Sequence, residues 1–135
     1  MSLTSDRYLR AVAATATACA LAACSGSVKE LDVDGFSPGA CTGLAGTLQE
    51  VNQALGEVSG EDITPQEASA RFKSAQQVLK MQREQSAEPV ASAVTDLVTS
   101  LGFFRIAVDS NNYDASQVDD VRTELEAVAM TCRGA

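Results

Sequence analysis

The stretch SPGACTGLAGTLQEVNQAL, residues 37–55, is the part of the chain from which we predict the fold. Ser37 followed by Pro38 is typical of a helix start, because serine caps free N–H groups and proline is preset for the first turn. After this start, apolar residues recur at intervals of three and four, which places them on one face of an α-helix. That face consists of Cys41, Leu44, Leu48, Val51 and Leu55. The stretch therefore predicts an amphipathic helix that buries this face against other helices.

Three further segments show the same pattern. Thr64 and Glu67 form a predicted capping box at the start of the second helix, Pro89 begins the third, and Asp114 with Gln117 begins the last. Their apolar faces consist of Ala68, Phe72, Ala75 and Leu79; of Val90, Val94, Leu97, Leu101, Phe104 and Val108; and of Val118, Val121, Leu125, Val128 and Cys132. Four such helices with short connections predict an all-α protein, an antiparallel up-down-up-down four-helix bundle.

The composition argues against several functional classes. With 18 acidic and 10 basic residues the net charge is −8, and we expect no binding to nucleic acid, whose phosphates repel such a chain. The sequence has no histidine to activate a serine nucleophile. A zinc site has no ligands left either, because we expect the cysteines of the mature chain to carry lipid or to form a disulfide. Residues 109–120 begin like a calcium loop, but Tyr113 stands where an oxygen ligand is needed and Asp114 replaces the required glycine. We therefore predict a protein that is not an enzyme and has no metal or cofactor.

The first 24 residues have the organisation of an export signal. Arg7 and Arg10 precede an uncharged apolar run over residues 11–20, and LAAC follows at residues 21–24. The apolar run is about half the length needed to span a bilayer. This segment resembles the signal peptide of bacterial lipoprotein precursors, whose lipobox LAAC matches at every position. The resemblance covers residues 1–24 alone.

The resemblance implies a membrane anchor and a location. In lipoproteins the lipobox cysteine receives a diacylglycerol, a peptidase cleaves before it, and the new amine is often acylated, so that Cys24 would carry acyl chains such as palmitate. We expect residues 1–23 to be the signal peptide, 24–37 the lipidated cysteine and a flexible tether, and 38–135 the bundle. The expected location is the outer face of the bacterial cytoplasmic membrane, in the cell envelope. The alternatives are an ordinary secretory signal beside an unrelated Cys24, or a buried N-terminal helix.

The cysteines predict one disulfide. If the export signal is removed, Cys19 leaves with it and Cys24 carries lipid, so Cys41 and Cys132 remain in an oxidising compartment. In an up-down-up-down bundle, the start of the first helix and the end of the fourth lie at the same pole, and both cysteines are on apolar faces. We expect a Cys41–Cys132 disulfide at this pole, with the tether entering there; two unpaired buried thiols are the alternative.

Two surface features are candidates for partner contact. Phe103 and Ile106 lie opposite the apolar face of the third helix, and we consider them either a docking spot or part of a wide core interface. Lys73, Lys80 and Arg83 lie roughly along one side of the second helix. They are either a contact for lipid headgroups or an acidic partner, or an ordinary solvated face.

The predicted function is a lipid-anchored, non-enzymatic binding module outside the cytoplasm, with an envelope protein as partner. The alternative is a carrier or scavenger that holds a small apolar ligand in the bundle core. Gly43 and Gly46 weaken the first helix and suggest a closely packed neighbour. A pocket lined by these glycines, Ala75 and Phe72 would favour the carrier, whereas a solid core with Phe103 exposed would favour the docking module.

Overall fold

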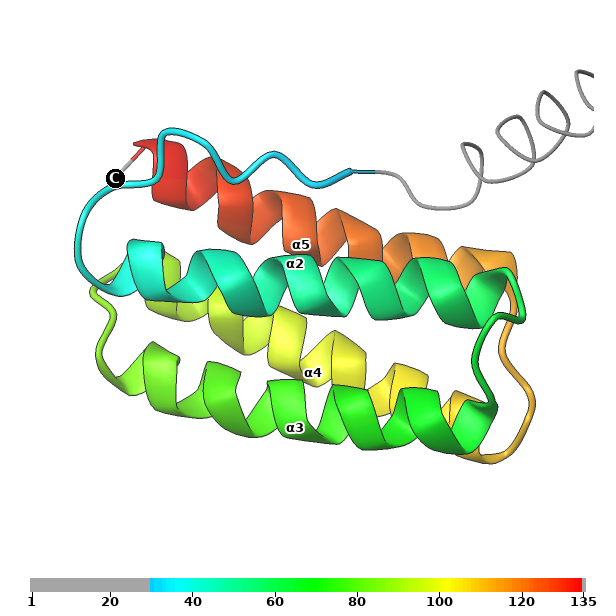
Figure 1. Ribbon diagram of the computed structural model, residues 1–135. Helices are drawn as coiled ribbons and strands as arrows, with labels where there is room; N and C mark the ends of the chain where they lie inside the picture. Colours follow the sequence, from blue (N-terminus) through cyan, green and yellow to red (C-terminus); the bar gives the residue numbers. More distant parts are fainter. Residues whose placement is uncertain (1–29, 135) are drawn as a thin grey trace, which may run out of the picture.

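The computed structural model describes residues 30–134, which form a bundle of four α-helices with no strand in that range (Figure 1). The helices are α2 (Ala40–Ser59), α3 (Pro65–Glu84), α4 (Val90–Asp109) and α5 (Ala115–Gly134). Both α2 and α4 pack against α3 and α5, so α2 and α4 lie diagonally opposite each other. The predicted antiparallel up-down-up-down bundle is confirmed.

The core is built from the four predicted apolar faces, and every residue of those faces is buried. At the pole of the α2–α3 and α4–α5 turns, the core contains two edge-to-face aromatic contacts. Ring centroids are 5.5 Å apart between Phe72 and Phe104, and 5.7 Å apart between Phe104 and Tyr113. The Tyr113 hydroxyl donates a hydrogen bond to the carbonyl of Val58 at 3.1 Å, which ties the two turns together. Burial of these aliphatic and aromatic side chains is the main source of stability.

The start of α3 follows the sequence prediction. Thr64 Oγ1 accepts a hydrogen bond from the Glu67 N–H at 3.2 Å, and the Glu67 carboxylate accepts one from the Thr64 N–H at 3.0 Å. These two bonds form the reciprocal capping box that the residue spacing predicted, with Pro65 in the first turn.

The start of α2 differs from the prediction, because Ser37 does not cap it. The helix begins at Ala40, after Gly39 with φ 95°, a left-handed conformation that favours glycine. Ser37 instead donates from its N–H and its hydroxyl to the carbonyl of Cys132, at 3.1 and 3.0 Å. The chain crosses the end of α5 at this point, so Ser37 satisfies a carbonyl that the last turn of α5 leaves free.

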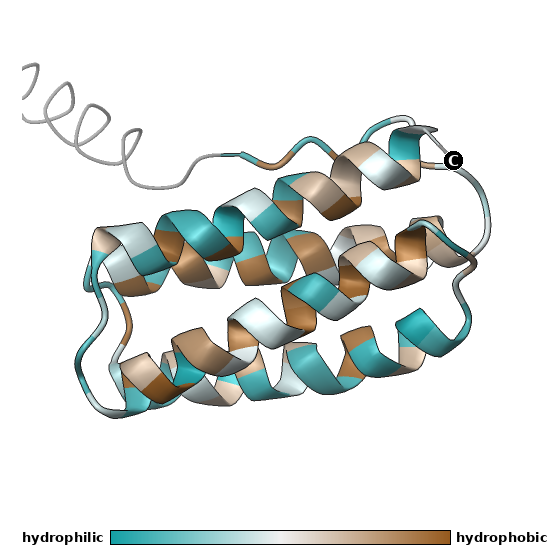
Figure 2. Cartoon of the chain, turned by 180° about the vertical axis from the view of Figure 1, so that it is seen from behind, coloured by the Kyte–Doolittle hydropathy of each residue, from teal (hydrophilic) through white to brown (hydrophobic). Residues whose placement is uncertain are grey.

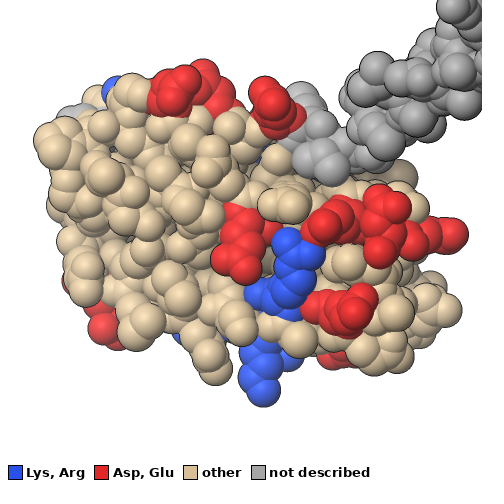
Figure 3. Space-filling model, in the orientation of Figure 1, with Lys and Arg blue, Asp and Glu red and all other residues tan. Residues whose placement is uncertain are grey.

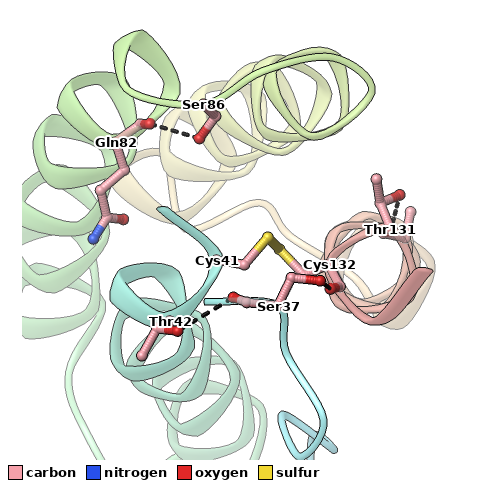
Figure 4. The surroundings of a disulfide bond; sticks show 8 residues. Ser37, Cys41, Thr42, Gln82, Ser86, Thr131 and Cys132 are labelled. Carbon is pink, nitrogen blue, oxygen red and sulfur yellow. Dashed lines mark hydrogen bonds between the residues drawn. A yellow bond between two sulfur atoms is a disulfide. The ribbon is translucent and has the colours of Figure 1, made fainter. Parts of the chain in front are cut away.

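The predicted disulfide between Cys41 and Cys132 is present (Figure 4). It joins the first turn of α2 to the last turn of α5, with the two Cα atoms 5.5 Å apart. Cys41 is 5% exposed and Cys132 is fully buried. The hydroxyl of Thr42 donates to the Ser37 carbonyl beside the bridge, so this pole is closed by covalent and hydrogen bonds together.

Residues 30–37, which we assigned to the tether, lie against the bundle. Leu31 and Phe36 pack on the core, and Arg133 Nη1 donates to the Asp32 carbonyl at 2.6 Å. From the disulfide pole this segment runs back along the side of α5 (Figure 1). It borders hollows that it shares with α2 around Asn52 and with α5. At Ser37 the chain reaches the disulfide pole, where we expected it to enter the bundle. The difference from the expectation is that the preceding residues are packed, so that at Glu30 the chain lies on the α2–α5 side of the bundle.

Candidate interaction surface

Phe103 and Ile106 are exposed on the outer side of α4. Their exposed fractions are 70% and 65%, whereas the six residues of the apolar face of α4 are buried. Because the buried face already fixes the rotation of the helix, these two side chains cannot turn inward. Of the two interpretations of Phe103 and Ile106, the structure agrees with an exposed apolar spot and not with a wide core interface.

These two residues end a longer line that we call the α4 outer stripe: Ser92, Asp96, Thr99, Phe103 and Ile106. All five are exposed, and they are spaced alternately by four and three residues, the spacing along which one helix packs beside another. Asp96 carries the only charge in the stripe. In the view from behind, α4 crosses the front of the bundle and is mostly brown, tan and white (Figure 2).

The low charge of α4 also shows in its overall composition. Within residues 30–134, α4 is the one helix long and apolar enough to cross a membrane by length and composition alone. Its buried face contributes to the bundle core, so part of this apolar character is explained by packing. The outer stripe accounts for part of the remainder.

A shallow groove lies beside Phe103, between α4 and α5. Its volume is about 200 Å³, and the residues along it are Ser100, Phe103, Phe104, Gln117, Asp120 and Val121. On the α5 side it is bordered by the exposed carboxylate of Asp120. Glu124 lies one helical turn further along the same side of α5. The α5 flank of the stripe is therefore acidic.

The α3 flank of the stripe is basic, and the contacts of Gln76 show which side of α3 faces α4. Its side-chain amide donates to the Val98 carbonyl at 3.1 Å and accepts from Arg105 Nη1 at 2.7 Å, so this side of α3 faces α4. Lys73 and Lys80 lie three residues before and four after Gln76, which puts them on the same side, and both are exposed. The two lysines of α3, together with Arg105 of α4, thus make the side of α4 opposite to Asp120 basic.

The third basic candidate, Arg83, lies seven residues after Gln76 in the last turn of α3 and is half-buried. Gln76 itself is buried, with 8% of its surface exposed. Its position four residues after the buried Phe72 was a signal that it borders the core. It belongs to the α3–α4 contact, where Gly102 leaves room for its amide.

The residues named for a carrier pocket do not meet around one cavity. Phe72 and Ala75 are in the core, whereas Gly43 and Gly46 are exposed on the outer side of α2. The expected close neighbour exists at Gly43, whose carbonyl accepts from the Gln82 amide at 2.8 Å. At Gly46 the expectation is wrong, since an added Cβ would meet no atom within 4 Å.

A second hollow, of about 500 Å³, lies at the pole of the α2–α3 and α4–α5 turns, next to Tyr113 and Arg122. Its carboxylates belong to Glu61, Asp114 and Asp119, which are all exposed and hence hydrated. In the described chain the buried polar side chains are Asn52 and Gln76, so none of these three carboxylates is buried.

The lipobox and Cys24 lie outside the described residues. Within those residues, no group of three or more cysteine, aspartate or glutamate side chains is placed to hold a metal ion. Comparisons of the chain with protein-family models, with curated proteins and with solved structures find no match. The function must therefore be argued from the residues of this chain, and the α4 outer stripe with its two charged flanks is the best candidate site.

Proposed function

We propose that this protein is a lipid-anchored, non-enzymatic binding module on the outer face of a bacterial cytoplasmic membrane, and that the α4 outer stripe is its docking surface. The observation that carries the proposal is the exposure of Phe103 and Ile106 on a helix whose core face is already filled. Burying a large apolar side chain is worth roughly 1.5–3 kcal/mol, so a partner that covers both gains substantial free energy.

The anchor is supported by the residues around Cys24. Arg7 and Arg10, the short apolar run and LAAC occur in the order of a lipoprotein signal peptide. The Cys41–Cys132 disulfide supports the same compartment, because disulfides persist mainly outside the cytoplasm. Acylation at Cys24 with two or more chains would hold the protein stably at the membrane.

The position of Glu30 orients the bundle on this anchor. Five residues lie between Cys24 and Glu30, and the six steps that join them reach about 20 Å at full extension. Glu30 lies on the α2–α5 side, and α4 is diagonally opposite α2. The anchor therefore joins the bundle on the α2–α5 side, and the stripe lies on the side away from it. This orientation suits contact with a protein better than contact with the anchoring lipid.

The carrier alternative has weaker support. Its ligand would need space in the core, yet Phe72 and Phe104 fill the end of the bundle where they meet edge to face. The basic side chains of α3 are better explained as one flank of the stripe than as a lipid contact, because Lys73 and Lys80 lie beside α4 and not on the α2–α5 side.

The proposal is tested in living cells with a photo-crosslinking amino acid at position 103 or, as control, at Met81. Met81 is 57% exposed on α3 and lies outside the stripe. We expect the probe at position 103 to give a discrete crosslinked species that the probe at position 81 does not give. In the Cys24→Ala variant, we expect the protein to leave the membrane fraction or to stay unprocessed.

The two parts of the proposal fail separately. Equal crosslinking from positions 103 and 81 would contradict the docking surface. Acyl labelling of Cys24→Ala at the wild-type level would contradict the anchor and leave the docking surface standing.

A further inference from the structure

We infer that the partner of the α4 outer stripe is a second copy of this chain, and that the two copies pack with their α4 helices side by side in parallel. This inference rests on the proposed binding role of the stripe and names its occupant. It follows from the charges on the two sides of α4, which make the surface complementary to itself.

The two flanks carry opposite charge at similar height along the bundle. Lys73 and Arg105 lie on the α3 side, and Asp120 and Glu124 lie on the α5 side, with the exposed Phe103 between them. A partner must offer an apolar centre with an acidic edge against α3 and a basic edge against α5. Another copy of the same surface has these features if it is turned so that its acidic α5 edge meets the basic α3 edge of the first copy, and the reverse.

Symmetry selects the parallel arrangement. A two-fold axis that runs roughly along α4 sets α3 of each copy against α5 of the other, so Lys73 faces the partner's Asp120 twice. A two-fold axis perpendicular to α4 sets α3 against α3 and α5 against α5, which opposes like charges on both flanks. Electrostatic complementarity of this kind determines which orientation of two surfaces is favoured.

Asp96 locates the contact along the helix. In two parallel helices that touched over their full length, Asp96 of each copy would approach the other and repel it. Helices that cross at about 50° touch over a few turns and then diverge. We place the crossing at Phe103 and Ile106, so that the helices separate toward Val90 and the two Asp96 carboxylates remain hydrated.

The membrane makes so small a contact effective. A crossing of two helices buries less than the roughly 800 Å² per partner that stable complexes bury, so the isolated chains associate weakly. Anchoring both copies to one surface raises their effective concentration without adding contacts. In the parallel arrangement, the two Glu30 residues lie at the same height along the axis, on opposite outer sides of the pair. Both anchors can therefore reach one membrane that lies beyond an end of the two bundles.

The test is thiol crosslinking of the full-length chain in intact cells with a short bismaleimide. In the parallel dimer, Ile106→Cys lies close to its own symmetry mate and should give a covalent dimer. The matched control is Met130→Cys, since Met130 has the same 65% exposure but lies on α5 beside residues 30–32. We expect a dimer from position 106 and only background from position 130.

Two further variants test the contact itself in the Ile106→Cys chain. Phe103→Asp should abolish the crosslink. Asp120→Lys should lower its yield by about two- to thirtyfold, the range spanned by two exposed ion pairs, and adding Lys73→Glu should restore it. An Asp120→Lys effect that Lys73→Glu does not reverse would overturn the parallel geometry.

The outcomes separate the dimer from the docking role. Equal crosslinking at positions 106 and 130 overturns the dimer. If, in addition, the photo-probe at position 103 captures a protein of different mass, the stripe binds another envelope protein and the proposed function stands. If the probe at position 103 also captures nothing above its control, the proposed function fails with the dimer.

Discussion

Asp114 fixes the start of α5 with its side chain. Its carboxylate accepts hydrogen bonds from the Ser116 hydroxyl at 2.7 Å and from the Gln117 N–H at 3.0 Å, and the Gln117 amide oxygen accepts from the Asp114 N–H at 2.9 Å. The bond from Ser116, followed by the backbone bond from Gln117, lowers the pKa of Asp114 below its ordinary value. The cap is therefore stronger in the charged state than in the protonated state.

This pKa predicts how stability depends on pH. A carboxyl whose pKa is lower in the folded than in the unfolded chain stabilises the fold above its unfolded pKa of about 3.9, and that contribution is lost as the pH falls through the folded pKa. We expect Asp114→Asn to lower the melting temperature near pH 7, and the difference from wild type to shrink below about pH 4.

Thermal unfolding followed by circular dichroism between pH 7 and 2 measures this difference. Asp119→Asn, on the exposed side of the same helix beyond the cap, is the control and should change the profile less. A constant difference between wild type and Asp114→Asn at all pH values would contradict the charged cap.

At the scale of the helix, α2 combines a well-formed core face with an outer face of small residues. Gly43 and Gly46 are exposed there. In Figure 3, the half of the molecule toward the disulfide pole, on the left, is mostly uncharged. Glycine in a helix interior costs about 0.5–1 kcal/mol relative to alanine, because more backbone freedom is lost on folding. At Gly46 no packing contact offsets that cost.

We therefore predict that Gly46→Ala raises the free energy of unfolding by about 0.5–1 kcal/mol. The comparison variant is Gly60→Ala, where the added Cβ would lie 2.9 Å from the Asp62 carboxylate and 3.3 Å from the Gly56 carbonyl. Gly60→Ala should lower the free energy of unfolding. Urea titrations of the two variants and wild type test both signs, and a destabilised Gly46→Ala would show that this face of α2 is covered.

For the whole molecule, the Cys41–Cys132 bridge closes nearly the entire bundle into one loop. The two cysteines are 91 residues apart in sequence. In the chain-entropy account, restricting the unfolded chain over such a loop is worth about 4–5 kcal/mol. Total stabilities of small domains are typically about 5–15 kcal/mol, so the bridge is a large share of the whole.

The prediction is that Cys41→Ala with Cys132→Ala lowers the free energy of unfolding by up to about 4–5 kcal/mol, measured by urea denaturation. Wild type treated with a reductant should approach the double variant, since both lack the covalent loop. A midpoint that neither reduction nor the double substitution moves would mean that the unfolded chain is not restricted by the bridge.

The sequence by itself determined the four helices, their buried faces and the pairing of Cys41 with Cys132. These features depend on local periodicity and on the alternation of helix direction, which can be read along the chain. The capping boxes at Thr64 and Asp114 could also be predicted from the sequence, because each joins residues three positions apart.

Only the tertiary structure decided the features that depend on which segments lie side by side. Ser37 resembles a cap in sequence, but the chain that crosses the end of α5 offers it the Cys132 carbonyl. Gln76 is buried because α4 packs over it, and the same packing sets Lys73 beside α4. The exposure of Phe103 was open in the sequence, because whether a neighbour covers a helix face depends on how the helices cross, which no local pattern records.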